Sequence, residues 1–223
     1  MPFLLERGIK VRSLWLAAVL ALLVPAAWTQ RNDDRRDSWQ RPQEVMDALA
    51  LREGSAVADV GAGDGYFTRH LSKRVGESGA VFAVDVDSGA LRRLQRLAEN
   101  EKLVNVRVVE GQTGNPQLPE NSLDGVLVVN AYHEFREFDA MMRHFFAALK
   151  PGGRLAIIDA VGNEDQARDR LMDGHRIAEK MVRDDAERAG FRFREKLSDI
   201  QRGGRRSTWF FLLFEKPADP AQN

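Results

Sequence analysis

The sequence contains no cysteine among its 223 residues. This absence excludes disulfide bonds, thiolate metal sites and thiol nucleophiles, and it is compatible with either an oxidising or a reducing compartment. Lys+Arg and Asp+Glu both number 33, so no net charge attracts nucleic acid or an anionic membrane to the surface as a whole. The sequence also has no internal repeat and no low-complexity tract. With 43% hydrophobic residues, it predicts one globular domain, and the balanced charge favours a small or neutral partner.

Long apolar runs are absent except near the N-terminus. There the basic segment "ERGIKVR" precedes an apolar run from Leu14 to Val24, and small residues follow that run. This order is typical of a secretory signal, and the run is short for a spanning helix. We therefore expect residues 1–29 to be a signal peptide or an N-terminal membrane anchor, which would leave the domain exported, either periplasmic or secreted, or tethered through this segment only. The alternative is a helix buried in the domain.

The rest of the chain alternates between two hydrophobic periods, after a charged linker over residues 30–41. Short apolar stretches predict strands, and stretches with an apolar residue every three or four positions predict helices between them. This order predicts an α/β domain over residues 42–217 with a doubly wound, mostly parallel sheet, followed by a tail over residues 218–223. The first five predicted strands are 56–60, 80–85, 106–110, 125–130 and 154–159.

Two further predicted strands, "FRFREKL" and "STWFFLLF", follow a helical segment predicted from Ile177 to Ala189. Only a short, glycine-containing connection separates them. A parallel pair needs a crossover of a dozen or more residues, so these two strands must pair antiparallel. The sheet is therefore expected to end in an antiparallel hairpin.

The stretch "VADVGAGDGYF" places glycines at 61, 63 and 65 between a predicted strand and a predicted helix. In open α/β folds, ligands bind where such a loop meets the carboxyl ends of the strands. Asp85 ends the next strand, 24 residues beyond Gly61, where a carboxylate can accept both hydroxyls of a ribose. The alternative is a glycine-rich turn that only lets helix and strand pack closely.

Two common nucleotide fingerprints are absent. The dinucleotide pattern G-x-G-x-x-G is not present, because Tyr66 stands at its last position, and there is no G-x-x-x-x-G-K-[ST]. A bulky residue where a pyrophosphate needs room favours a nucleoside without phosphates. The spacing therefore disfavours an NAD-dependent oxidoreductase.

Four segments together resemble a known family. "VADVGAGDGYF", "AVDVD", "LPENSLDGVLVVNAYHEF" and "LKPGGRLAIID" have the order and spacing found in class I S-adenosylmethionine-dependent methyltransferases of the small-molecule type. The resemblance covers residues 42–217. It implies a Rossmann-like sheet of seven strands with an antiparallel last strand, and S-adenosyl-L-methionine as the cofactor.

The resemblance also implies roles for individual residues. Asp59 and the Gly61 to Gly65 loop would hold the methionine end of the cofactor, Asp85 its ribose, and Asn130 would lie beside the sulfonium. Relatives often carry an acidic pair where this chain has "TGNPQLP", so Asn115 either contacts the adenine or belongs to an ordinary Asn-Pro turn. The predicted cofactor-binding residues are Asp59, Gly61, Ala62, Gly63, Gly65, Asp85, Val86, Asn115 and Asn130. No metal ligands are predicted.

The segment "NAYHEF" follows the fourth strand, near the position of the transferable methyl group. Its His133 is the predicted catalytic base, oriented by Glu134. Alternatively, His133 only caps or packs under the loop. A second histidine, His175, either closes the acceptor pocket or is incidental to function.

The predicted function is methyl transfer to a small-molecule acceptor by in-line displacement. The alternative is a nucleoside-binding or scaffold protein that kept the fold and lost turnover. The chain lacks the N/D-P-P-Y pattern of enzymes that methylate bases and any basic stripe with interleaved aromatic residues, so no nucleic-acid partner is expected. The sequence gives no indication of the oligomeric state.

Overall fold

The computed structural model describes residues 35–201 and 208–218. The predicted signal peptide or anchor over residues 1–29 lies outside these residues, as does the tail beyond residue 218. The chain divides into two units, residues 1–38 and residues 39–223, and the fold below is that of the second. Within the described ranges, no helix combines the length and the apolar character that crossing a membrane requires.

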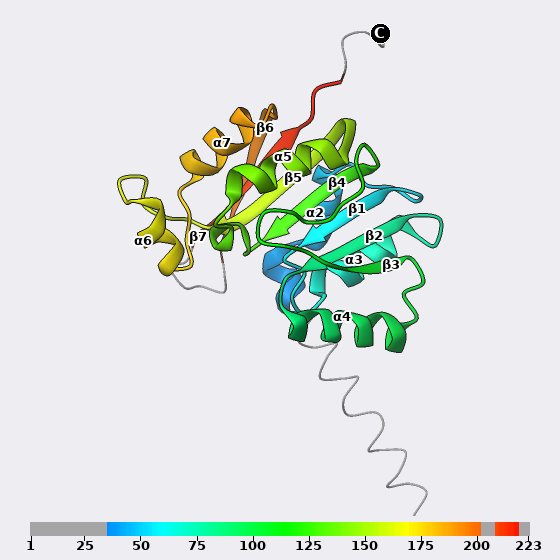
Figure 1. The fold of residues 1–223 in the computed structure, drawn as a ribbon. Coiled ribbons are helices and arrows are strands. Elements are labelled where there is room, and N and C mark those ends of the chain that lie inside the picture. Colours follow the sequence, from blue (N-terminus) through cyan, green and yellow to red (C-terminus); the bar gives the residue numbers. More distant parts are fainter. Residues whose placement is uncertain (1–34, 202–207, 219–223) are drawn as a thin grey trace, which may run out of the picture. The chain divides into compact units, whose positions relative to one another are not determined.

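The centre of the domain is a sheet of seven strands in the order β3-β2-β1-β4-β5-β7-β6 (Figure 1). The pairs that join the first five strands are all parallel, whereas β7 is antiparallel to both of its neighbours. The predicted Rossmann-like sheet with its antiparallel last strand is therefore confirmed. The strands are β1 (Ala56–Val60), β2 (Ala80–Asp85), β3 (Val106–Glu110), β4 (Leu123–Val129), β5 (Leu149–Ala160), β6 (Arg192–Gln201) and β7 (Thr208–Glu215).

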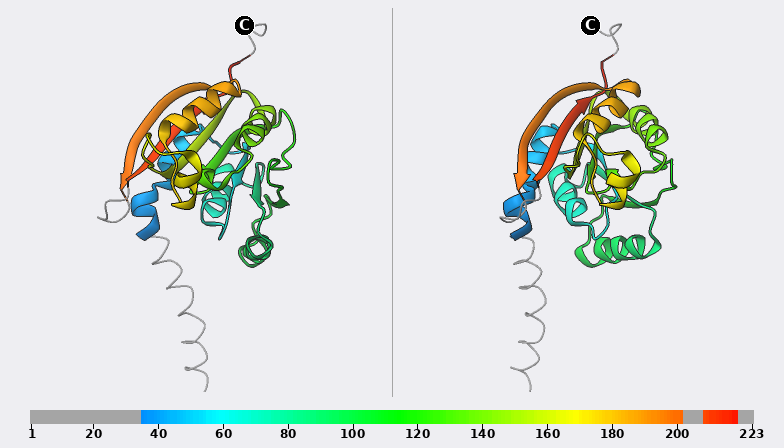
Figure 2. Two further views of the ribbon diagram at one scale, coloured as in Figure 1. Left: turned by 60° about the vertical axis from the view of Figure 1, so that its left-hand side comes forward. Right: turned by 90° about the vertical axis from the view of Figure 1, so that its left-hand side faces the viewer.

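Helices cover both faces of this sheet (Figure 2). One apolar cluster joins α5 (Phe138–Ala148) and α7 (Glu179–Arg188) to one face, and a second joins α2 (Pro42–Ala48) and α3 (Tyr66–Val75) to the other. The helix α4 (Ser88–Glu101) packs through Leu94 against β2. The two remaining short elements are the single-turn 3₁₀ helix η1 (Tyr132–Glu134) and the helix α6 (Arg168–Asp173).

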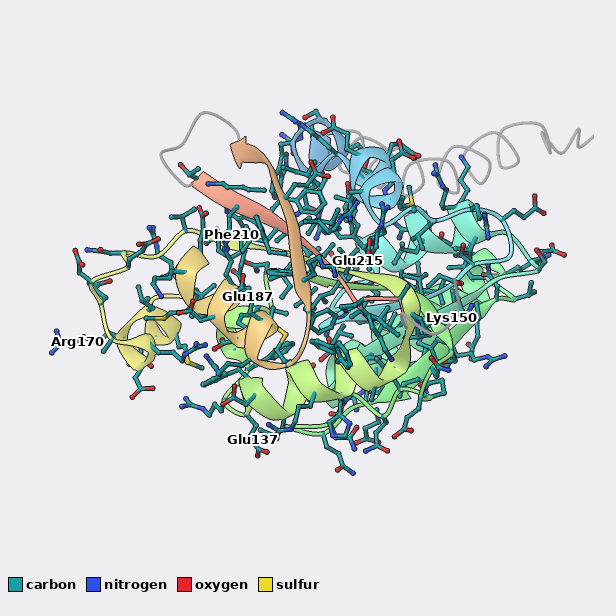
Figure 3. The ribbon with its side chains drawn as sticks, turned by 90° about the horizontal axis from the view of Figure 1, so that it is seen from above. Glu137, Lys150, Arg170, Glu187, Phe210 and Glu215 are labelled. Carbon is teal, nitrogen blue, oxygen red and sulfur yellow. The ribbon has the colours of Figure 1, made fainter. Side chains whose placement is uncertain are left out.

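The amphipathic patterns of the sequence account for this layering. Phe67, Leu71 and Val75 recur every four residues in α3 and are all buried. Phe210 of β7 is fully buried, whereas Glu137 and Arg170, which Figure 3 also labels, lie exposed at the periphery. Burial of the apolar face is the main stabilising contribution of such helices.

One local expectation was wrong, and two further details follow only from the folded chain. Asp87, not Ser88, caps α4, because its side chain accepts the backbone N–H of Ala90 at 2.7 Å. The helix predicted from Ile177 begins only at Glu179, and β3 is a partly exposed edge strand rather than one covered on both faces. A one-residue difference in cap position arises because Asp and Ser are nearly equal at this position, so only the backbone geometry decides.

Candidate functional site

The loop after β1 and the end of β2 are joined by a carboxylate. Asp85 accepts the backbone N–H of Gly63 through Oδ2 at 2.9 Å and that of Asp87 through Oδ1 at 3.0 Å. The side chain therefore points toward the glycine loop, as the predicted ribose-binding role requires. We call Asp59, residues 61–65 and Asp85 the loop site.

Two of the three glycines are closely packed within the protein. All three have positive φ angles, of 75°, 57° and 79° in chain order. A Cβ on Gly61 would lie 2.4 Å from Cβ of Ala131, and one on Gly65 would lie 2.3 Å from Cδ2 of Leu97. The packing role that the sequence left open is thus correct for Gly61, whereas at Gly65 the overlapping atom is the end of a flexible leucine side chain, which can move. Gly61 also brings the loop into direct contact with the segment that follows β4.

Gly63 is different, because its missing side chain meets nothing in the protein. The nearest heavy atom to a Cβ built there is the Gly61 carbonyl oxygen, at 3.9 Å. The backbone is therefore bare at this point without any neighbour that demands it. Among the described residues, this is the position in the loop that leaves room for a ligand to lie against the main chain.

The loop amides are largely used by the protein itself. The N–H groups of Gly61 and Ala62 both donate to the Val84 carbonyl, and that of Gly65 donates to the Ala62 carbonyl. A phosphate held by backbone N–H groups would have to displace these bonds. This pattern agrees with a ligand without phosphates, but the steric argument from Tyr66 was wrong. Its ring is buried in the core, 5.0 Å from the Phe67 ring.

Asp59 lies beneath the loop rather than on it. Its side chain is buried, and Oδ2 accepts the hydroxyl of Thr68 in α3 at 2.6 Å. The side chain of Ala62 is also buried, against Ala83 and Leu94, so only its main chain faces the loop. Val86 is 65% exposed directly after Asp85, which leaves an apolar surface beside the carboxylate.

Asn115 lies in the loop between β3 and β4. Its Oδ1 accepts the backbone N–H of Gln117 at 2.8 Å, which is the Asx turn that an Asn-Pro sequence favours. The residue lines a cavity of about 480 Å³ together with Phe82 and Arg107, which belong to the first halves of β2 and β3. This cavity is not at the carboxyl ends of the strands. The adenine-binding role of Asn115 stays a prediction.

Asn130 follows β4 directly. It is exposed and has a left-handed backbone conformation, with φ of 54°, and its N–H donates to the Ile158 carbonyl of β5 at 2.8 Å. Asparagine tolerates this conformation better than most residues. The chain thus turns sharply at the end of β4 and enters η1.

His133 is held by a buried aspartate that sequence reasoning missed. Nδ1 of His133 lies 2.8 Å from Oδ1 of Asp159, and the backbone N–H of His133 donates to Oδ2 of the same carboxylate at 3.0 Å. The carboxylate also accepts the N–H of Ala160, and it is fully buried. Because a carboxylate only accepts, Nδ1 carries the proton and Nε2 of the neutral ring is left as the acceptor. A signal was present, since an acidic residue ends the strand beside β4.

Two more side chains face Nε2 of His133. Nδ1 of His175 lies 3.3 Å away and Oε1 of Glu134 lies 3.7 Å away. Glu134 is therefore near the ring, but the carboxylate that orients the ring is Asp159. We call His133, Glu134, Asp159 and His175 the histidine cluster.

The pKa of His133 reflects two opposing causes. Burial lowers the pKa, whereas the hydrogen bond and charge of Asp159 raise it, with a smaller contribution from the charge of Glu134. The net result is a pKa above the ordinary value of histidine. The net effect of the surrounding protein groups is thus to stabilise the charged form of the ring relative to a free histidine.

A second buried network fixes the position of η1. The hydroxyl of Tyr132 donates to Oδ2 of Asp185 in α7 at 2.7 Å, and Arg168 donates to the same oxygen at 2.7 Å. Burial and the negative charge of Asp185 raise the pKa of Tyr132 well above its usual range. Tyr132 is therefore a neutral hydrogen-bond donor that anchors the segment carrying His133.

Known proteins that are similar in sequence to this chain are described as methyltransferases. Residues 57–153 match the family described as "Methyltransferase domain". A ubiquinone/menaquinone biosynthesis C-methyltransferase UbiE of Pasteurella multocida (strain Pm70) is 32% identical over 122 residues, which are 54% of this chain and 45% of that protein. The chain spans about half the length of the curated relatives it matches.

Solved structures extend the similarity to most of the domain. A SAM-dependent methyltransferase from Aquifex aeolicus has a TM-score of 0.71 and 26% identity, over 86% of this chain and 98% of that one. The [4+2]-cyclase SpnF has a TM-score of 0.70 and 18% identity, over 81% of this chain and 82% of that one. The second likeness concerns the fold alone.

Proposed function

We propose that this chain is a class I S-adenosylmethionine-dependent methyltransferase that transfers a methyl group to a small-molecule acceptor. The single observation that carries the proposal is the link between Asp85 and Gly63. It joins a partly exposed carboxylate to the one loop position whose side-chain space is free. The family match over residues 57–153 supports the same conclusion.

The residues of the loop site suit the proposed cofactor. Asp85 would accept the ribose hydroxyls, the bare backbone at Gly63 would lie against the methionine end, and exposed Val86 offers an apolar surface for the base. Asn130 would lie beside the sulfonium. When bound, S-adenosyl-L-methionine supplies an electrophilic methyl group for an in-line displacement.

The protein's own contribution to such a reaction is alignment, exclusion of water and removal of a proton from the acceptor. Gly61 of the loop site packs against Ala131, which precedes His133 by two residues in the sequence. With Nδ1 engaged by Asp159, the ring presents only Nε2, beside Glu134. His133 and Glu134 are therefore the proposed groups that act on the acceptor, which we take to be a small organic molecule.

A second candidate function is binding without methyl transfer. A protein described as a [4+2]-cyclase has a similar fold, so the fold by itself does not establish methyl transfer. Export of the domain through residues 1–29, which we propose from their tripartite pattern, also favours this alternative. An exported enzyme would need a supply of a cofactor that is made inside cells.

Calorimetric titration with S-adenosylhomocysteine and with NAD tests the proposed ligand. We expect the purified protein to bind the first and not the second, and heat with NAD alone would contradict the proposal. The variant Asp85→Ala should lose about 1.5–3 kcal/mol of binding free energy, roughly 10- to 150-fold in affinity, because hydrogen bonds to a charged group are lost. Glu99→Gln, an exposed change on α4, is the matched control.

Transfer itself requires a second measurement. Incubation with methyl-labelled S-adenosylmethionine and an extract of small molecules should yield a labelled product that disappears with Asp85→Ala. Binding of S-adenosylhomocysteine without any labelled product would favour the binding protein instead.

A further inference from the structure

The histidine cluster has the organisation of a metal-binding site. Metal-bound histidines almost always donate their second ring N–H to a carboxylate or carbonyl, which fixes the ring and its tautomer. Asp159 accepts from Nδ1 of His133 and also from the backbone N–H groups of His133 and Ala160, so its carboxylate is held from several sides. The fully buried carboxylate of Asp159 thus fixes the direction of the lone pair on Nε2 of His133.

Three ligand atoms converge in front of that anchor. Nε2 of His133, one ring nitrogen of His175 and a carboxylate oxygen of Glu134 all lie within 4.8 Å of one another. His133 is buried, whereas Glu134 and His175 are exposed. The arrangement therefore has a closed side formed by protein and an open side toward solvent.

The spacing of the two imidazoles fits a shared metal ion. A tetrahedral zinc ion with metal–nitrogen distances of about 2.0–2.1 Å separates two nitrogen ligands by about 3.3 Å. The observed separation between Nε2 of His133 and Nδ1 of His175 is 3.3 Å, with the rings perpendicular at 89°. Without an ion, the same separation allows an N–H of one imidazole to donate to the other ring.

The two ligand segments are positioned by main-chain hydrogen bonds. Beyond His175, the N–H of Ile177 donates to the Ala160 carbonyl at 3.1 Å, and the N–H of Gly162 donates to the Ile177 carbonyl at 2.8 Å. These bonds attach the His175 segment to the end of β5, next to Asp159. A site on such supported segments keeps its geometry before the ion binds.

We propose that His133, His175 and Glu134 form a binding site for a divalent transition-metal ion of the zinc type, with Asp159 as the positioning carboxylate. Two imidazoles and one carboxylate leave a fourth position open, as in catalytic zinc sites. A nitrogen-rich set favours zinc-like ions over magnesium or calcium, which prefer oxygen ligands. The proposal departs from our expectation from the sequence that the chain has no metal ligands.

The site goes beyond the proposed methyl transfer and does not depend on it. Because Ala131 contacts Gly61, the cluster lies on the segment next to the loop site. If the proposed function also holds, His133 and Glu134 act on the acceptor through the ion and not as a free base. The open coordination position would then receive an oxygen or nitrogen atom of the acceptor and lower the pKa of that group. The acceptor would then belong to the class of small molecules with a metal-binding heteroatom.

The test is equilibrium metal binding to the full chain without an affinity tag. Protein freed of metal with a chelator is titrated with Zn²⁺ against a chromophoric competitor. We expect one ion per chain, and about 10- to 100-fold weaker binding in Glu134→Gln and His175→Gln, whose side chains are exposed and whose replacement spares the core. His144→Gln, an exposed histidine of α5 outside the cluster, should bind as the unchanged protein does.

Substitution of Co²⁺ provides an independent readout. A tetrahedral site should give visible absorption bands that the two cluster variants lose and His144→Gln keeps. Zn²⁺ binding that is equal in all variants, or absent from the unchanged protein, overturns the proposal. S-adenosylhomocysteine binding, measured on the same samples, reports separately on the proposed function, so failure of one is distinguishable from failure of the other.

Discussion

The loop site and the histidine cluster bring their functional groups together in different ways. The loop site lies within one β–α–β unit, and it works through bare main chain and a single carboxylate that reaches across from β2. The histidine cluster draws its members from separate segments, with His133 lying 26 residues from Asp159 and 42 residues from His175 along the chain. One region is a local motif, and the other exists only in the folded domain.

The two regions also differ in what they require energetically. In the loop site, strain is confined to glycines, which adopt positive φ angles at little cost. In the histidine cluster, a fully buried carboxylate must be compensated by several donors. We therefore expect substitutions in the cluster to affect stability most and substitutions at the free glycine to affect binding most.

The largest effect is expected for Asp159→Ala. Removing the buried carboxylate leaves three donors without their acceptor, and loss of one member of such a buried charged pair costs about 3–5 kcal/mol in the free energy of unfolding. Urea unfolding followed by tryptophan fluorescence measures it. Asp165→Ala, an exposed change, should stay within about 0.5 kcal/mol of the unchanged protein. A loss below about 1 kcal/mol for Asp159→Ala would mean that the cluster is not a stabilising feature.

The second prediction compares the stability losses caused by substituting two glycines of the same loop. Gly61→Ala should lose about 2–4 kcal/mol of unfolding free energy, because its Cβ would overlap Ala131 as well as being strained by positive φ. Gly63→Ala should lose only about 1–2 kcal/mol, from backbone strain alone.

Affinity for S-adenosylhomocysteine should show the reverse order. Gly63→Ala is expected to stay folded and bind weakly, as calorimetry of the folded variant would record. Equal stability losses at the two positions, or full affinity in Gly63→Ala, would contradict the distinction between a packing glycine and a ligand-facing one.

The smallest effect concerns pH in chelator-treated protein. The pKa of His133 is higher in the folded protein than its ordinary value of about 6.5, so its contribution to stability is fully present below that value. The contribution is lost as the pH rises through the folded pKa. The groups that face the ring are Asp159, Glu134 and His175.

Urea midpoints at a series of pH values test this dependence. The unchanged protein and His144→Gln should lose stability across this window, and His133→Gln should lose less than either. Identical slopes for His133→Gln and the unchanged protein would show that this ring is not the titrating group.

Much of the fold followed from local patterns. The apolar strands, the glycine loop and the short connection before β7 each have a signal within a few residues, and these predicted the parallel sheet with its antiparallel end. Asp85 was also predictable, because strand ends in a parallel sheet meet at one edge. The cap of α4 was not, since neighbouring Asp87 and Ser88 compete for one role.

By itself, the sequence determined the class of fold, the glycine loop and the carboxylate one strand away, since each is encoded by residue type and short-range spacing. Only the tertiary structure decided that Gly63 is the one glycine of the loop with free side-chain space, that Tyr66 is a core residue, and that Asp159 orients His133 beside His175. The physical reason is the distance along the chain over which each interaction acts. Periodicity and turn chemistry act over a few residues, whereas a buried acceptor finds its donors through the packing of strands and loops far apart in the chain.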